Sequence, residues 1–135
     1  MAVFRLRVIT PEKIFFDGDI EQLIVRTTEG DIGILAKHEN YVAELPSGAM
    51  KIKIDGEFKL AAVSTGIVKV SMDKTTVIAN AVEWADEIDI EWAKRSAEDA
   101  RHKLEQKQSD DEFLHANLKL KRALNRISVS SMDKK

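Results

Sequence analysis

Apolar and polar residues alternate with a period of two along the first part of the chain. Apolar side chains alternate with arginines over 4–8 and with lysines over 50–54. Such alternation is typical of strands with one buried face. Further β-rich runs, separated by glycines, prolines and a turn, occupy 20–27, 67–71 and 75–79. Many short strands with regular breaks predict a sandwich or flattened barrel of antiparallel strands.

One turn in this region has a clear chemical signature. The dipeptide Asp55-Gly56 follows the alternating run 50–54 and precedes a second strand-like run over 57–60. Asp-Gly supplies the two positive φ angles that a type I′ turn requires. The sequence therefore predicts a β-hairpin here.

The periodicity changes after Trp84. No glycine or proline follows this residue, and helix-forming residues dominate the rest of the chain. Asp86 or Asp89 can cap a first helix. Ser109 with Glu112 forms the S-x-x-E capping box of a second helix. The C-terminal part is therefore predicted to be a helical hairpin.

These two patterns predict an α+β protein with a β-sandwich domain over 1–84 and a two-helix hairpin over 85–135. The expected apolar stripe of the first helix is small and consists of Ala93, Ala97, Ala100 and Leu104. The stripe of the second helix is larger and consists of Phe113, Ala116, Leu120, Ala123, Leu124 and Ile127. Alanine buries little apolar surface, and each Å² of apolar surface buried stabilises a fold by only about 25 cal/mol. We therefore expect a hairpin of marginal stability, suited to a conformational switch.

Composition limits the functions that the chain can perform. Its 135 residues are enough for one core and a short attachment. It has no cysteine, and no apolar run approaches the roughly 18 residues that a membrane helix needs. The N-terminus enters a strand pattern directly, so we expect no signal or transit peptide and a protein that stays where it is made. The motifs of a nucleophile elbow, a metal triad and a phosphate-binding glycine loop are also lacking, so we expect no catalytic residue and no metal site.

Charge is unevenly distributed along the chain, although the net charge is only -2. The stretch 113–128 carries four cations and no acid: Lys119, Lys121, Arg122 and Arg126. Cations near a helix C-terminus are stabilised by the helix dipole, so a solvated helix face is one interpretation. Docking to an acidic partner, weakened by salt, is the other.

A ten-residue motif in the first domain resembles a known family. The stretch 29–38 reads Glu-Gly-Asp-Ile-Gly-Ile-Leu-Ala-Lys-His, which resembles the signature of the epsilon subunits of F-type ATP synthases. The segments that resemble the family's opening strand, turn and later glycine-centred strand, in the same order, are 8–13, 16–18 and 64–70. The segment 88–93 is similar to the family's Ile/Leu-Asp-x-x-Arg-Ala motif, with Trp92 in place of the arginine.

The resemblance implies a non-catalytic central-stalk subunit of the bacterial type. Its β-sandwich would contact the gamma subunit and the rotor ring of c subunits. Its hairpin would fold onto the sandwich or extend along gamma toward the catalytic beta and alpha subunits. Such a subunit couples proton-driven rotation to ATP synthesis and inhibits ATP hydrolysis. We expect it at the cytoplasmic side of the cell membrane as a peripheral component, with no nucleic-acid partner and no required cofactor.

The resemblance also assigns two contact regions. The residues that carry over to the contact with the rotor ring and gamma are Glu29, Asp31, Gly33 and His38. We expect them on a surface loop that two glycines allow to follow a tight path. Taken alone, an acid and a histidine in such a loop are more often solvated turn residues. The residues that carry over to inhibitory docking on the acidic region of the beta subunit are Lys119, Lys121, Arg122 and Arg126.

Some bacterial epsilon subunits that resemble this chain bind ATP between the helices and the sandwich. The residues that carry over to this site are Glu83, Ile88, Asp89, Ala93, Arg122 and Arg126. The two arginines lie one helical turn apart, where their guanidinium groups can hold a polyphosphate. Trp92 removes a fixed charge and its donors from the site, and we expect its ring either to stack on a base or to pack against the sandwich. ATP sensing, with ATP as a regulatory ligand, is therefore the alternative function.

Overall fold

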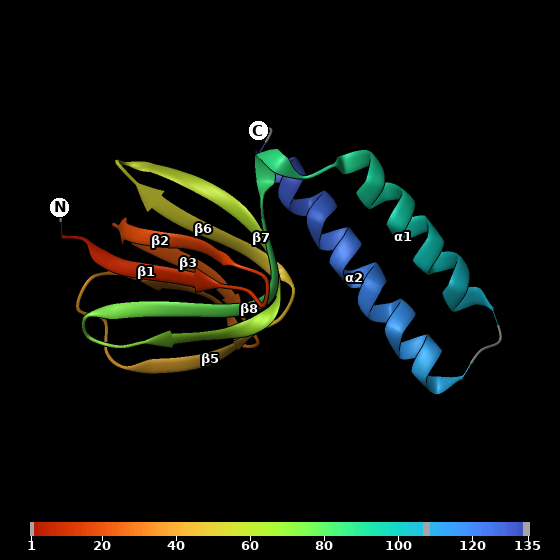
Figure 1. The fold of residues 1–135 in the computed structure, drawn as a ribbon, viewed down its shortest axis with the longest axis horizontal. Helices are drawn as coiled ribbons and strands as arrows, with labels where there is room; N and C mark the ends of the chain where they lie inside the picture. Colours follow the sequence, from red (N-terminus) through yellow and green to blue (C-terminus); the bar gives the residue numbers. More distant parts are fainter. Residues whose placement is uncertain (1, 107–108, 134–135) are drawn as a thin grey trace. The chain divides into compact units, whose positions relative to one another are not determined.

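The computed structural model describes residues 2–106 and 109–133. The chain forms two compact units, Met1–Trp84 and Ala85–Lys135, both drawn in Figure 1. Strands make up the first unit and helices make up the second.

Eight strands form the first unit. Their bounds are β1 (Phe4–Ile9), β2 (Ile14–Ile20), β3 (Gln22–Thr27), β4 (Gly30–Ile34), β5 (Tyr41–Leu45), β6 (Gly48–Ile54), β7 (Glu57–Val70) and β8 (Lys74–Trp84). They belong to one sheet in the order β2-β1-β8-β7-β6-β3-β4, and β5 pairs with β7. The neighbouring strands are antiparallel except for β1 and β8, which run parallel.

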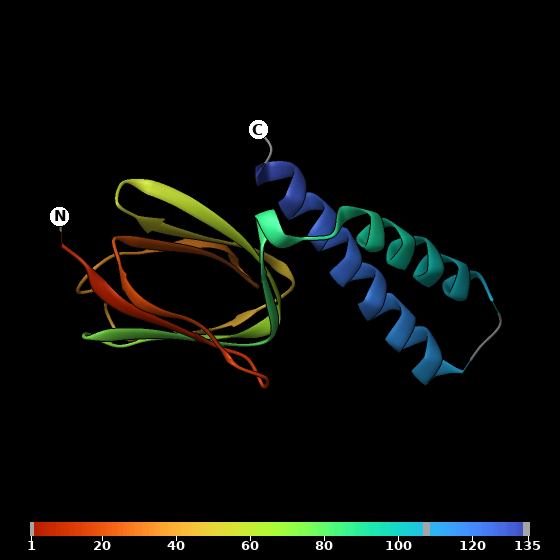
Figure 2. The ribbon, with the colours of Figure 1, turned by 45° about the horizontal axis from the view of Figure 1, so that its top comes forward.

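The long strand β7 joins the two layers of the sandwich. Its first half pairs with β6, whereas its residues 66–70 pair with β5, so the sheet changes direction in between. At this bend Gly66 passes very close to β8. A Cβ on Gly66 would lie 2.8 Å from the Cα of Ala79 and closer still to the carbonyl oxygen of Ile78. The sheet therefore folds onto itself, and Figure 2 shows the two resulting layers.

The core of this unit lies between the layers and consists of the inward positions of the alternating runs. The side chains without exposed surface include Leu6, Val8, Met50 and Ile52. This burial confirms the half-buried strands predicted over 4–8 and 50–54. The predicted hairpin is also confirmed, because Asp55 and Gly56 have φ angles of 50° and 80° and connect β6 to β7.

The second unit consists of η1 (Ala85–Glu87), α1 (Ile90–Glu105) and α2 (Asp110–Asp133). The backbone N–H of Trp92 donates to the carboxylate of Asp89 at 3.0 Å, so Asp89 rather than Asp86 caps α1. The backbone N–H of Glu112 donates to Ser109 Oγ at 3.2 Å, as the capping box predicted. Within 2–106 and 109–133, the helices lack the length and apolar character needed to cross a membrane. The predicted class, a β-sandwich followed by a helical hairpin, is confirmed.

The two helices pack through alanines. The buried alanines are Ala93, Ala97, Ala100, Ala116 and Ala123. The predicted stripe of α2 is wrong at Phe113 and Leu124, which are 52% and 40% exposed. Alanine contacts use only a narrow strip of each helix, so the larger side chains beside this strip remain open. Val129 and Ser130 are buried instead, and sequence reasoning missed them.

Candidate functional site

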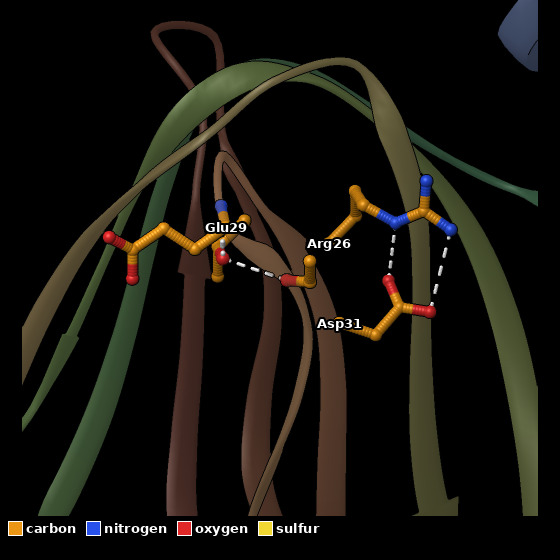
Figure 3. Close-up of polar contacts among 5 residues, drawn as sticks. Arg26, Glu29 and Asp31 are labelled. Atoms are coloured by element: carbon orange, nitrogen blue, oxygen red, sulfur yellow. Dashed lines mark hydrogen bonds and ion pairs between the residues drawn. The ribbon is translucent and has the colours of Figure 1, made fainter.

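The motif 29–38 begins at the turn between β3 and β4. Arg26 pairs in register with Asp31, and Thr27 pairs with Gly30, so only two residues form the loop. The Thr27 hydroxyl donates to the carbonyl oxygen of Gly30 at 2.7 Å and accepts from the backbone N–H of Glu29 at 3.1 Å. Gly30 has a φ of 114°, which an L side chain rarely adopts. This tight turn leaves Glu29 exposed at its tip, as Figure 3 shows.

Arg26 and Asp31 form a forked ion pair across the hairpin. Arg26 Nε donates to Asp31 Oδ1, and Nη2 lies 3.4 Å from Oδ2 (Figure 3). The hydrogen bond from Arg26 lowers the pKa of Asp31, partly opposed by desolvation and assisted by the charges of Arg26 and Lys51. Both side chains of the pair are 55% exposed, and exposed ion pairs stabilise a fold by only about 0–1 kcal/mol. The pair therefore fixes the direction of the Asp31 carboxylate more than it stabilises the sandwich.

The motif is not the surface loop that the sequence predicted. Five of its residues form strand β4, because apolar Ile32 and Ile34 alternate with Asp31 and Gly33 and point into the unit. Glu29 lies in the turn before this strand and Asp31 near its start, while His38 lies beyond its other end. His38 Nδ1 is 2.7 Å from the carbonyl oxygen of Glu39. The two ends of the motif therefore present two separate groups of polar side chains.

Gly33 lies in the middle of β4, opposite Ile24 of β3. A Cβ at this position would meet only the amide nitrogen of the Gln22 side chain, at 3.3 Å. Because that group is the end of a flexible side chain, Gly33 leaves the outer surface of the strand open rather than satisfying a strained turn.

The candidate residues on the helices fall into two groups. Lys119 and Arg126 face α1: Lys119 Nζ is 3.6 Å from Asp99 Oδ2, and the Arg126 guanidinium lies 5.0 Å from the centre of the Trp92 ring. Lys121 and Arg122 are exposed.

The predicted nucleotide residues are also spread over both units. Ile88, Asp89 and Ala93 lie at the start of α1, where Asp89 is used as the helix cap and Ala93 is buried. Glu83 belongs to β8 in the first unit, in register with Ala62. Trp92 is 48% exposed and faces Arg126. Among the described residues no group of three or more side chains is arranged to bind a metal ion.

Sequence reasoning missed an apolar row on the outer face of the sandwich. Paired positions on neighbouring strands bring Ile14 of β2, Ile9 of β1, Ile78 of β8 and Ile67 of β7 side by side. Ile14, Ile78 and Ile67 are 51%, 49% and 40% exposed. Each of these residues occupies an outward position, where the alternation calls for a polar side chain. These apolar residues at outward positions could have been noticed in the sequence. Only the register of the strands shows that the four residues lie side by side.

A surface cavity of about 640 Å³ adjoins this isoleucine row. Its lining includes Ile67 and Ile78 from the row, Leu45 at the end of β5, Pro46 directly after it, and Gly66 at the bend of β7. The side-chain amide of Asn80 donates to Thr65 Oγ1 at 2.7 Å, at the edge of the cavity. An apolar row beside a cavity of this size can receive apolar side chains from another molecule.

Comparisons with known proteins agree for both units. Residues 3–85 match the family described as "ATP synthase, Delta/Epsilon chain, beta-sandwich domain", and residues 86–131 match "ATP synthase, Delta/Epsilon chain, long alpha-helix domain". The chain is 55% identical to the ATP synthase epsilon chain of Ruminococcus albus over 132 residues, covering 97% of this chain and 98% of that one. It is 39% identical to that of Bacillus velezensis, covering 96% and 98%.

A similar fold occurs in a solved structure, the cryo-EM structure of the Euglena gracilis mitochondrial ATP synthase, described as OSCP/F1/c-ring. The TM-score is 0.80 at 22% identity, with 93% of this chain and 79% of the other covered. At this identity the likeness concerns the fold.

Proposed function

The chain belongs to the delta/epsilon chain family of ATP synthase, as its motifs predicted, and on this premise we propose that it joins the gamma subunit to the rotor ring and restrains ATP hydrolysis through its hairpin. It is a non-catalytic subunit of the epsilon type. In this role it couples proton-driven rotation to ATP synthesis, and it reaches the cytoplasmic side of the cell membrane as a peripheral component of the complex.

The isoleucine row (Ile9, Ile14, Ile67 and Ile78) is the observation that carries this proposal. A protein that acts alone has no use for adjacent exposed isoleucines beside an apolar cavity, whereas a stalk subunit needs a lasting apolar contact. We assign this surface to gamma. Large apolar side chains of gamma would cover the row and enter the cavity. Both the isoleucine side chains and the cavity lining would then be shielded from water.

The polar ends of β4 supply the second contact. Glu29, on a turn whose backbone is held by Thr27, and the Asp31 carboxylate held by Arg26 form a polar tip that suits the polar loops of a rotor ring. A tight turn and a forked ion pair reduce the entropy lost on docking, because few side chains must be ordered. His38 lies at the other end of β4 and provides a separate contact on the same partners.

Replacement of Ile67 and Ile78 together by Asp tests the assignment to gamma. The variant should no longer co-purify with gamma when the synthase is reassembled, because two charges would have to be desolvated in the interface. Met72→Asp is the matched control, since Met72 is 69% exposed and lies in the turn between β7 and β8. The milder double variant Ile67→Thr/Ile78→Thr keeps β-branched side chains, which preserves the strands. It should also co-purify less with gamma, so loss of the fold cannot be the only explanation. Normal co-purification of both double variants would refute the assignment.

The hairpin is proposed to inhibit hydrolysis through the four cations of α2, two of which, Lys121 and Arg122, are exposed. They would meet the acidic region of the beta subunit when the hairpin extends. The described part of α2 between 113 and 128 has no acid to compensate these charges. Such docking is steered by charge and weakens with salt over a screening length of about 8 Å.

ATP sensing by the hairpin stays a prediction. Arg126, one of the two arginines assigned to a polyphosphate, has its guanidinium over the Trp92 ring. A nucleotide that uses Arg126 must compete with this contact. Titration of the full chain with ATP, followed by the fluorescence of Trp84 and Trp92, tests the prediction. The absence of a saturable change up to millimolar ATP would contradict it.

A further inference from the structure

We propose that Trp92 and Asp99 of α1 form an interhelical latch with Arg126 and Lys119 of α2, which closes the hairpin without a bound ligand and withholds two of its four cations from docking. The regulatory part of this inference rests on the proposed inhibition, whereas the latch itself is a property of the chain alone.

The helix interface needs such contacts because its buried side chains are mostly alanines. Ala93, Ala97 and Ala100 of α1 meet a strip of α2 that contains Ala116 and Ala123. Alanines permit a close approach of two helices, but they bury little area and are alike in size. A shift of one helix along the other therefore exchanges one alanine contact for another. Directional contacts are required to select one register.

The two latch contacts select the same register. In an antiparallel pair the residue numbers of partners have a constant sum, and Trp92 with Arg126 and Asp99 with Lys119 both give 218. Trp92 and Asp99 are seven residues apart, as are Lys119 and Arg126. Seven residues are two helical turns, or about 10.5 Å at 1.5 Å per residue, so both contacts lie along one edge of the hairpin. One contact can therefore strengthen the other.

Each contact is favourable but weak. The Arg126 guanidinium lies 5.0 Å from the centre of the Trp92 ring, within the range of a cation–π interaction, and tryptophan has the most effective ring for it. The Lys119 ammonium lies 3.6 Å from the Asp99 carboxylate, which also forms an ion pair with Lys103 at 3.5 Å. All these groups are partly exposed. Together the two contacts should change the ratio of closed to open hairpins by about five- to thirtyfold.

The identity of residue 92 decides whether its contact with Arg126 is attractive or repulsive. An arginine at position 92 would place its positive charge beside that of Arg126, and the hairpin would then need an anion between the two guanidinium groups to close. Tryptophan replaces this repulsion by attraction. In this chain closure is therefore built into the helices and does not require a polyphosphate.

The latch also determines which cations are presented. Lys119 and Arg126 face α1 in the closed hairpin, whereas Lys121 and Arg122 are exposed. Opening the hairpin exposes Lys119 and Arg126 as well, so all four cations become available to a partner. An acidic partner thus binds the open form better, because it gains two further charges, and this differential affinity shifts the equilibrium toward opening.

The test measures amide hydrogen exchange in α1 and α2 of the full chain, without other synthase subunits. Trp92→Arg should speed exchange at the helix interface by about fivefold or more, and 1 mM inorganic tripolyphosphate should reverse this change. Arginine forms helices well, so a loss of helix propensity does not explain the effect. Phe113→Arg is the matched control, because it places the same side chain at a 52% exposed aromatic position of α2 and should leave exchange unchanged.

A charge exchange tests the second contact. Asp99→Lys should speed exchange by about two- to fivefold. Asp99→Lys/Lys119→Asp should restore it in part, because the pair with α2 forms again while a like charge remains beside Lys103. Unchanged exchange in both Trp92→Arg and Asp99→Lys would overturn the latch. Faster exchange in Trp92→Arg that tripolyphosphate does not reverse would overturn the like-charge explanation.

ATP hydrolysis by the reassembled synthase separates the latch from the proposed inhibition. Trp92→Arg should inhibit hydrolysis more strongly than the native chain. If exchange changes as expected and hydrolysis does not, the latch stands and the regulatory role is refuted. If truncation after Trp84 relieves inhibition but the latch variants leave amide hydrogen exchange unchanged, the proposed inhibition is supported and the latch is refuted.

Discussion

Replacement of Gly66 by alanine should strongly destabilise the sandwich, because the backbone of β7 at this glycine has no room for a Cβ beside β8. The added Cβ would lie 2.8 Å from the Cα of Ala79, 3.0 Å from its Cβ and closer still to the carbonyl oxygen of Ile78. Real Cβ atoms essentially never come within 3.0 Å of such neighbours. Two of the three neighbouring atoms belong to the backbone, so no side-chain rotation can relieve the clash.

The size of the destabilisation can be estimated from the shift of β7 away from β8 that the added Cβ requires. Overpacking in a filled site costs about 1–3 kcal/mol. Separating the two strands at this point also weakens one or two ladder hydrogen bonds, at about 0.5–1.5 kcal/mol each. Gly66→Ala should therefore lower the free energy of unfolding by about 2–5 kcal/mol. For a unit of this size the midpoint of thermal unfolding falls by about 4–8 °C per kcal/mol, so we expect a decrease of at least about 8 °C.

Thermal unfolding followed by far-UV circular dichroism measures the effect. Gly18→Ala is the matched control, because a Cβ on Gly18 of β2 would meet only the Phe16 ring at an ordinary 3.4 Å. That variant should unfold within about 3 °C of the native chain. A Gly66→Ala midpoint equally close to the native one would refute the assigned close approach. Since Gly66 also lines the cavity beside the isoleucine row, its replacement should weaken co-purification with gamma as well.

Three further outcomes are expected. Asp31→Asn should lower the free energy of unfolding by less than about 1 kcal/mol at pH 7, because the Arg26 hydrogen bond lowers the pKa of an exposed carboxylate, and urea titrations should show this difference vanish as the pH falls through that lowered pKa. A difference that persists at low pH would contradict the ion pair. Truncation after Trp84 should raise ATP hydrolysis by the reassembled synthase, and an unchanged rate would contradict inhibition by the hairpin. Lys121→Ala/Arg122→Ala should relieve inhibition in part, with a smaller effect in high salt, whereas salt-independent relief would argue against charge-steered docking.

Local chemistry accounts for the elements that could be predicted from the sequence. The alternation over 4–8 and 50–54 selects strands, because neighbouring side chains in an extended chain point to opposite faces. The φ angles of Asp55 and Gly56 follow from the dipeptide itself. The caps at Asp89 and Ser109 depend only on a side chain and a backbone N–H three residues later.

Contacts between distant segments were decided by the register of strands and helices. The motif 29–38 had the composition of a loop, yet five of its residues became a strand because β3 supplied a partner for it. Arg26 was not a candidate, since only this pairing places it beside Asp31. The isoleucine row spans four strands whose alignment no local pattern encodes.

The same distinction holds in the hairpin. The sequence placed alanines at helical spacing and located Trp92 in a motif that otherwise carries arginine. Its contact with Arg126 depends on the antiparallel register of α1 and α2, which arises only when both helices pack. Local preferences act through bonded neighbours and hydrogen bonds within one turn, so they are legible along the chain. Surfaces, ion pairs and latches join residues far apart in sequence, and their positions follow from packing.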